Sequence, residues 1–234
     1  MQKNKQQRKK VEVGPLVIRN STQRKIAIIG GTGSGKTTTL KLLALKAETP
    51  IYVFDPLNVI RIKGFQNVII RKQQASRGAE AGQLFNKVKQ DKINMIFSFK
   101  DMLQKEMVEW VDGFFGTWKP HDCMIAFDEV HEFVPERSTG GEYSFEVERA
   151  VRHWRNTNCG FMFTSQRPAM VRKNVMALTD FLVLYRVTWV NDLSVVRELL
   201  NSSIPKDRTD KIVADIQKGG FLDGYGIDFQ PTSQ

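Results

Sequence analysis

The chain has 234 residues, enough to bury the core of one α/β domain, and its 41% hydrophobic and 26% charged residues exclude a disordered chain. Its net charge of +10 favours an anionic partner, most simply nucleic acid, over the alternative of a basic surface that only aids solubility.

The cysteines and the apolar runs predict where the protein is located. Cys123 and Cys159 lie far apart without C-x-x-C spacing, so neither a metal site nor a disulfide framework is expected, and a reducing environment is favoured. No apolar run approaches the roughly 18 residues of a membrane span, and no apolar segment follows the basic N-terminus as in a signal peptide. We therefore expect a cytoplasmic protein.

The first ten residues form a basic run, with Lys or Arg at five positions and no acidic residue, which is half of the net charge. Because such a run is typical of a disordered tail, we expect a tail over residues 1–10 and a single domain over 11–234. The tail is either solvated or a contact for DNA phosphates, a capsid or a membrane surface.

Short apolar runs at 11–13, 16–18 and 25–29 predict strands, and the last leads into a glycine-rich stretch, Gly30–Thr37. This stretch fits G-x-x-x-x-G-K-[ST] and opens a helix expected to run to about Ala47. Its glycines let backbone N–H groups approach a nucleotide's phosphates, Lys36 can reach the β- and γ-phosphates, and the Thr37 hydroxyl can bind Mg²⁺. The expected nucleotide-binding residues are Gly30, Gly31, Thr32, Gly33, Ser34, Gly35, Lys36, Thr37 and Thr38.

The next strand, at 51–54, ends in Asp55-Pro56, which leaves a carboxylate at the edge where open α/β sheets bind ligands. Further strands are expected at 68–70 and 93–99, and helices at about 80–88 and 102–118. In the second helix, large apolar residues recur at helical spacing and indicate core: Met107, Trp110, Val111, Phe114 and Phe115.

The apolar run 123–127 is followed by two carboxylates, Asp128 and Glu129. Downstream of a phosphate-binding loop, an aspartate in this place holds the Mg²⁺ shell, and a glutamate directly after it can deprotonate the attacking water. We therefore expect Asp128 and Thr37 at the metal and Glu129 as the catalytic base. The alternative is a pair of surface acids at the end of a strand.

Polar and charged residues also mark the second half of the chain. A helix expected at about 143–156 places Arg149, Arg152 and Arg155 on one face, either solvated or in contact with a neighbouring subunit or DNA. A strand within 160–168 presents Thr164, Ser165 and Gln166 at its carboxyl end, where the amide of Gln166 can sense the γ-phosphate. A strand at 181–187, helices at 192–200 and 208–217 and a closing hairpin at 219–229 complete the chain.

Four of these elements together resemble the HerA/FtsK group of P-loop ATPases, and within it the small genome-packaging ATPases of membrane-containing icosahedral viruses. They are Gly30–Thr37, Asp55-Pro56, Asp128-Glu129 and Thr164-Ser165-Gln166-Arg167-Pro168, and their order and spacing agree over roughly residues 15–200. The phosphate-binding loop is common to the superfamily, and the late Gln-Arg-Pro element narrows the resemblance to this group. The resemblance implies a three-layer α/β fold of the RecA-like (ASCE) P-loop NTPase class with a mainly parallel central sheet.

The resemblance further implies an ATP hydrolase that uses ATP and Mg²⁺, assembles into a ring, expected to be a hexamer, and threads double-stranded DNA without regard to sequence. Gln166 would be its sensor, and a neighbouring subunit would donate an arginine finger, for which Arg155, Arg186 and Arg197 are candidates, the first two in the favoured segments. Such a motor would act in the host cytoplasm or at a virion's packaging vertex, where the tail would meet a capsid or membrane protein.

Two alternatives to the DNA motor stay open. One is an ATPase for morphogenesis, secretion or conjugation-type coupling that acts on protein or membrane partners. The other is a nucleotide switch or a small-molecule kinase, which is disfavoured because the sequence has no evident lid.

Overall fold

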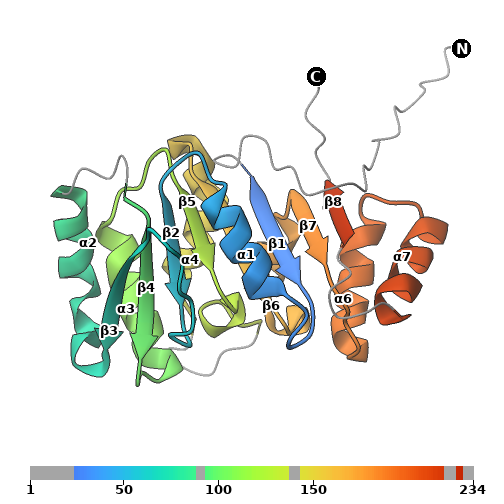
Figure 1. The fold of residues 1–234 in the computed structure, drawn as a ribbon, viewed down its shortest axis with the longest axis horizontal. Coiled ribbons are helices and arrows are strands. Elements are labelled where there is room, and N and C mark those ends of the chain that lie inside the picture. Colours follow the sequence, from blue (N-terminus) through green and yellow to red (C-terminus); the bar gives the residue numbers. More distant parts are fainter. Residues whose placement is uncertain (1–23, 88–92, 137–142, 219–224, 229–234) are drawn as a thin grey trace, which may run out of the picture.

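The computed structural model describes residues 24–87, 93–136, 143–218 and 225–228, which fold into an eight-stranded sheet with helices on both faces (Figure 1). The strand order is β3-β4-β2-β5-β6-β1-β7-β8, and neighbouring strands are parallel except for β7 and β8. The predicted α/β class with a mainly parallel sheet is therefore confirmed. The expected strands at 11–13 and 16–18 lie outside the described residues, as does most of the expected hairpin at 219–229.

The strands and helices lie close to the predicted positions. The strands are β1 (Lys25–Ile29), β2 (Ile51–Asp55), β3 (Gln66–Arg71), β4 (Met95–Lys100), β5 (Met124–Phe127), β6 (Gly160–Ser165), β7 (Phe181–Leu184) and β8 (Tyr225–Asp228). The helices are α1 (Lys36–Leu45), α2 (Gly78–Lys87), α3 (Gln104–Thr117), α4 (Phe145–His153), α5 (Lys173–Ala177), α6 (Val190–Asn201) and α7 (Lys206–Lys218). The short helix α5 and the 3₁₀ segments η2 (Lys72–Arg77), η3 (Val130–Glu132) and η5 (Pro168–Met170) were not predicted, because one or two turns are too short to show helical periodicity. The 3₁₀ segment η4 (Trp154–Thr157) forms the end of the helix expected at about 143–156.

Two hydrophobic cores, one on each face of the sheet, hold the helices in place. Successive side chains of a strand point to opposite faces, so Ile26 and Ile28 of β1 pack with α1, whereas Ala27 and Ile29 belong to the core formed with the other helices. The five apolar residues that repeat along α3 are all buried in this second core, which confirms that they are core residues. Among the described residues, no helix combines the length and the apolar character needed to cross a membrane.

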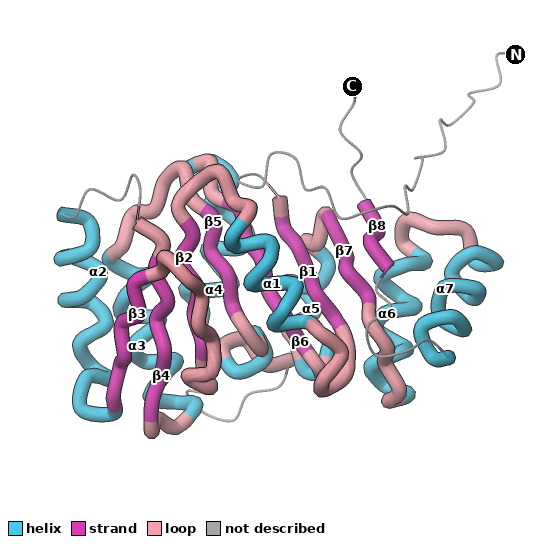
Figure 2. Tube along the Cα trace, viewed as in Figure 1, coloured by secondary structure: helices cyan, strands magenta, loops and turns pink. Residues whose placement is uncertain are grey.

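The sheet order brings three loops together. β6 lies between β1 and β5, and all three strands are parallel. Their carboxyl ends therefore meet at one edge of the sheet, where the tube in Figure 2 turns into loops. These loops carry Gly30–Lys36, Asp128-Glu129 and Gln166, so motifs that are far apart in the sequence become neighbours at this edge.

Candidate nucleotide site

The loop between β1 and α1 has the backbone shape that its glycines predict. Gly35 has φ +97°, a left-handed conformation that favours glycine, and it directly precedes α1. At Gly30 a Cβ atom would lie 2.6 Å from both Ser34 Oγ and Tyr185 Cβ, so a side chain does not fit there. The Gly31 N–H donates to the Arg186 carbonyl at 2.8 Å, which ties the loop to the segment after β7.

The N-terminus of α1 is open to an anion. Its N-cap residue is Gly35, which has no side chain to cap the helix, and the first turn of α1 contains no acidic residue. The first N–H groups of a helix lack partners within the helix and carry partial positive charge, so they bind phosphate well. The donors available at this loop therefore fit the triphosphate of a nucleotide.

Lys36 is buried, and its ammonium group points back under the loop. Its Nζ donates to the Gly31 carbonyl at 3.2 Å and lies 3.5 Å from Glu129 Oε1. A buried charge needs such partners because removing it from water is costly. The sequence-predicted lysine and glutamate are thus brought into one ion pair.

Asp128 is buried at the end of β5 and is reached by two hydroxyl groups. Thr164 Oγ1 donates to Asp128 Oδ1 at 2.7 Å, and Thr37 Oγ1 donates to the same oxygen at 3.3 Å. Burial raises the pKa of Asp128, and the neighbouring carboxylates Glu129 and Asp55 raise it further, whereas the two hydroxyl hydrogen bonds lower it. Because ionising this carboxyl group is costly, a bound cation would stabilise its charged form. The Thr37 hydroxyl and the Asp128 carboxylate supply the oxygen ligands that Mg²⁺ prefers.

Glu129 has a left-handed backbone, with φ +43°, which is unfavourable for a residue with a side chain. The end of β6 holds it at two points: the Glu129 N–H donates to Thr164 Oγ1 at 2.9 Å, and the Gln166 N–H donates to Glu129 Oε2 at 2.9 Å. Backbone strain that the surrounding bonds maintain is concentrated at functional sites. The carboxylate is therefore fixed in the space between the loop and β6.

Gln166 connects the loop to the end of β6 through its side chain. Its Oε1 accepts a hydrogen bond from Thr32 Oγ1 at 2.7 Å. The sequence indicated a sensing role for Gln166 but not its contact with Thr32, because the two residues are separated by 134 positions in the chain.

Two further residues at the site were missed. The Thr164 hydroxyl donates to the Asp128 carboxylate and accepts the Glu129 N–H, as described above, whereas the sequence indicated only a polar residue at the end of a strand. His131 in η3 is buried with Nδ1 3.5 Å from both Glu129 Oε2 and Ser165 Oγ. Burial lowers the pKa of His131, and the nearby carboxylate of Glu132 raises it by less, so the imidazole is neutral at neutral pH. Its position two residues after Glu129 was the only signal in the sequence.

A cavity of about 300 Å³ adjoins the loop. The cavity is lined by Gly31, Thr32, Gln166, Arg167, Val187, Thr188, Trp189 and Asp192. Asp192 is buried and lies 3.4 Å from Arg167 Nε, and the Arg167 guanidinium lies over the Trp189 ring at 5.5 Å. Trp189 thus lines the same cavity as Gly31 and Thr32 of the phosphate-binding loop, and it is exposed to solvent.

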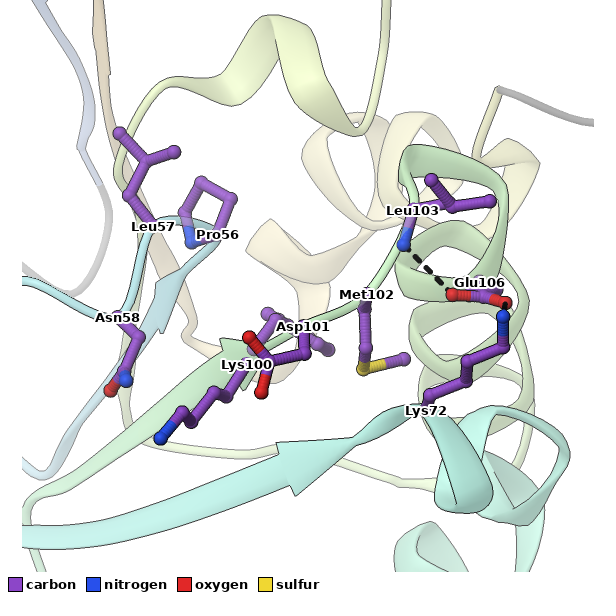
Figure 3. A pocket seen from close by; sticks show the side chains of 10 residues that line it. Pro56, Leu57, Asn58, Lys72, Lys100, Asp101, Met102, Leu103 and Glu106 are labelled. Atoms are coloured by element: carbon purple, nitrogen blue, oxygen red, sulfur yellow. Dashed lines mark hydrogen bonds and ion pairs between the residues drawn. The ribbon is translucent and has the colours of Figure 1, made fainter.

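A second cavity, of about 520 Å³, lies at the carboxyl ends of β2 and β4 (Figure 3). Its lining residues are Pro56, Leu57, Asn58, Lys72, Phe99, Lys100, Asp101, Met102, Leu103 and Glu106. Figure 3 shows Lys72 directed toward Glu106. Lys72 Nζ lies 3.2 Å from Glu106 Oε1, and Glu106 Oε2 accepts a hydrogen bond from the Leu103 N–H at 2.8 Å. This cavity contains no residue of the phosphate-binding loop, so it is separate from the nucleotide site.

Asp55 is the last residue of β2, at the carboxyl edge of the sheet as expected. Its carboxylate is buried, and it accepts hydrogen bonds from the Ile60 N–H at 2.7 Å, the Leu57 N–H at 3.2 Å and the Ser98 hydroxyl at 3.3 Å. These bonds shape the loop after β2, so the carboxylate is not left open for a ligand.

The three arginine-finger candidates are in different situations. Arg197 on α6 forms an ion pair with Asp210 of α7 at 2.7 Å. Arg186 follows β7 next to the phosphate-binding loop, and the side chain of Arg155 lies outside the described residues. In the expected arginine face of α4, Arg149 and Arg152 are paired with Glu146 and Glu148 of the same helix.

Several solved structures share this fold. The genome packaging NTPase B204 from Sulfolobus turreted icosahedral virus 2, in complex with AMPPCP, aligns with a TM-score of 0.58 at 14% identity over 89% of this chain and 93% of that chain. VirB4 of Thermoanaerobacter pseudethanolicus aligns with a TM-score of 0.54 at 11% identity over 89% of each chain. The bacterial conjugative coupling protein TrwBdeltaN70 aligns with a TM-score of 0.52 at 10% identity over 79% of this chain and 73% of that chain. At such identities the likeness shows a common fold.

The family is shown by the sequence itself. No curated protein sequence matches the chain. Residues 26–183 match the family described as ATPase family associated with various cellular activities (AAA), a range that contains the loop after β1, Asp128-Glu129 and the end of β6. Because this match spans more than half of the chain, the protein belongs to the AAA family and is an ATP-hydrolysing enzyme.

Proposed function

We propose that the protein is a translocase of double-stranded DNA of the HerA/FtsK kind that packages a viral genome into a preformed capsid. The proposal rests chiefly on one observation: Lys36, Glu129 and Gln166, taken from three separate motifs, converge at one sheet edge. The net charge of +10 favours a polyanionic cargo, and the fold is shared with a genome packaging NTPase.

In the proposed reaction, the loop amides and Lys36 hold the triphosphate, and Glu129 takes a proton from the attacking water. Lys36 is paired with Glu129 at 3.5 Å, so an arriving γ-phosphate would compete with the carboxylate for the ammonium. That exchange would free Glu129 for the water, which makes its activity depend on bound nucleotide. A positioned general base contributes about 10²- to 10⁴-fold to the rate.

Thr37 and Asp128 are the residues that would hold Mg²⁺, through a hydroxyl and a carboxylate oxygen. When bound, Mg²⁺ neutralises charge on the phosphates. Asp128 would keep its place through the Thr164 hydrogen bond at 2.7 Å.

Gln166 is suited to report the state of the γ-phosphate, because its side chain contacts Thr32 and its backbone contacts Glu129. Loss of the phosphate would change both contacts and move the end of β6. We further propose a ring, expected to be a hexamer, in which a neighbour's Arg155 or Arg186 completes the site. Arg197 is disfavoured because it is paired with Asp210.

In this proposal the motor works in the host cytoplasm or at a packaging vertex of the virion. The basic tail over residues 1–10 would contact DNA, a capsid protein or a membrane protein there. Contacts to DNA would be made mainly to phosphates, so they would not depend on sequence.

The test is ATP hydrolysis with and without duplex DNA at two salt concentrations, combined with the mass of the assembly. We expect duplex DNA to raise the rate, the stimulation to fall as salt increases, and the mass to be that of a ring. The variant Glu129→Gln is the catalytic control: it should bind ATP but hydrolyse it about 10²- to 10⁴-fold more slowly.

Hydrolysis that is unaffected by duplex DNA would contradict DNA as the cargo. It would favour a second candidate, an ATPase of the secretion or conjugation kind that acts on protein or membrane partners. This candidate is supported by the fold shared with VirB4 and with a conjugative coupling protein. Full activity of Glu129→Gln would instead contradict the assigned base.

A further inference from the structure

The sheet brings the two cysteines of the chain together. Cys123 directly precedes β5 and Cys159 directly precedes β6, and these strands are paired in register from Met124 and Gly160 onward. The Gly160 N–H donates to the Cys123 carbonyl at 2.9 Å, so the pairing begins at the cysteines. Their Sγ atoms lie 3.5 Å apart. The sequence predicted no disulfide because the two residues are 36 positions apart in the chain. They become neighbours in space because β5 and β6 are adjacent parallel strands.

The two thiols differ in environment. Cys123 is 1% exposed and Cys159 is 7% exposed. The hydrogen bond from Cys123, assisted by Thr157, lowers the pKa of the Cys159 thiol to about 7, whereas the same bond and burial raise the pKa of the Cys123 thiol. Because the thiolate is the nucleophile in disulfide exchange, Cys159 would react first.

We propose that Cys123 and Cys159 form a reversible disulfide in response to an oxidised low-molecular-weight thiol such as glutathione disulfide. The Cys159 thiolate attacks one sulfur of glutathione disulfide, whose S–S bond breaks and releases one glutathione thiolate. Cys123 then loses its proton to water, and its sulfur attacks Cys159 Sγ and releases the second glutathione. Two protein thiols are oxidised, and one glutathione disulfide is reduced to two glutathione molecules.

Only a small movement is needed, from the 3.5 Å between the Sγ atoms to the roughly 2.05 Å of a disulfide bond. The bond would close a loop from Cys123 to Cys159 that contains Asp128, Glu129 and α4. A cross-link of this kind restricts the unfolded chain and raises the melting temperature. Oxidation would therefore stabilise the part of the sheet that carries both candidate carboxylates.

The experiment uses the full chain, first reduced and then equilibrated at low protein concentration with glutathione buffers of increasing oxidised fraction. Alkylation of the remaining thiols and denaturing mass spectrometry count them. We expect the count to fall from two to zero in a single chain with the loss of two hydrogen atoms, reversal by reductant, and a higher melting temperature for the oxidised chain.

Matched variants test the order of the steps. Cys123→Ala should stop as a mixed disulfide with one glutathione on Cys159, and Cys159→Ala should react far more slowly at Cys123. The wild-type measurement does not depend on how these variants fold. The proposal is overturned if the wild type yields only intermolecular or mixed disulfides, if both thiols survive in the most oxidising buffer, or if the oxidised chain melts at a lower temperature.

Discussion

Replacing Thr164 by valine removes one hydroxyl group that bonds to the Asp128 carboxylate and to the backbone N–H of Glu129. Thr164 Oγ1 donates to Asp128 Oδ1 at 2.7 Å and accepts the Glu129 N–H at 2.9 Å, and the residue is fully buried. Valine has nearly the same shape and suits a strand, so the backbone of β6 should be kept. The substitution thus isolates the two hydrogen bonds.

The cost follows from these two bonds. Hydrogen bonds to charged groups contribute about 1.5–3 kcal/mol, and a buried N–H left without an acceptor costs about 1–3 kcal/mol. Because the effects share one hydroxyl group and are not additive, we expect Thr164→Val to lower the free energy of unfolding by about 2–4 kcal/mol. Loss of the hydroxyl should also raise the pKa of Asp128 further, since this bond is the largest factor that lowers it.

Urea unfolding and steady-state ATP hydrolysis measure the two consequences. Thr164→Ser is the matched control, because it keeps the hydroxyl group and loses only a methyl group. We expect the valine variant, but not the serine variant, to hydrolyse ATP at least about tenfold more slowly, the factor that corresponds to about 1.4 kcal/mol in the barrier. If valine and serine variants are equally stable and equally active, Thr164 does not position the carboxylates.

Four further predictions concern single side chains. At pH 7, without Mg²⁺ or nucleotide, the Asp128→Asn variant should have a higher free energy of unfolding than the wild type, because a raised carboxyl pKa means that ionisation destabilises the folded state. The difference should shrink as the pH falls toward about 4, where the Asp128 carboxyl group becomes protonated. A difference in urea unfolding that does not depend on pH would refute this. Trp189, which is 58% exposed and lines the cavity beside the phosphate-binding loop, should change its fluorescence when an ATP analogue binds, and Trp189→Phe should abolish the change. Arg197→Ala should keep hydrolysis within about twofold, because an exposed ion pair contributes only about 0–1 kcal/mol. If Arg186 is the finger, Arg186→Ala should be inactive alone and regain activity when mixed with Glu129→Gln subunits, and failure of this mixing assay would remove Arg186 as a candidate.

Local sequence determined much of this protein. The strand and helix positions follow from apolar runs and helical spacing. The apolar runs form strands such as β2, whose residues are all buried, and the apolar residues that repeat along α3 are buried in the core. The phosphate-binding loop is likewise local: its glycines, Lys36 and the start of α1 are contiguous, and a short stretch of backbone shapes them. A P-loop ATPase of the α/β class could therefore be inferred from residue order.

Contacts between distant strands were decided only by the tertiary structure. Insertion of β6 between β1 and β5 places Thr164 against both Asp128 and Glu129, and sets Cys159 beside Cys123. Asp55 shows the converse: it ends β2 at the carboxyl edge of the sheet, as its Asp-Pro pattern indicated, but its loop folds back and satisfies the carboxylate with two N–H groups and a hydroxyl. The sequence shows which chemical groups are available, whereas the order of the strands and the course of the loops decide which of these groups come into contact. Hydrogen bonds form only between groups that the packed sheet brings within about 3 Å of each other.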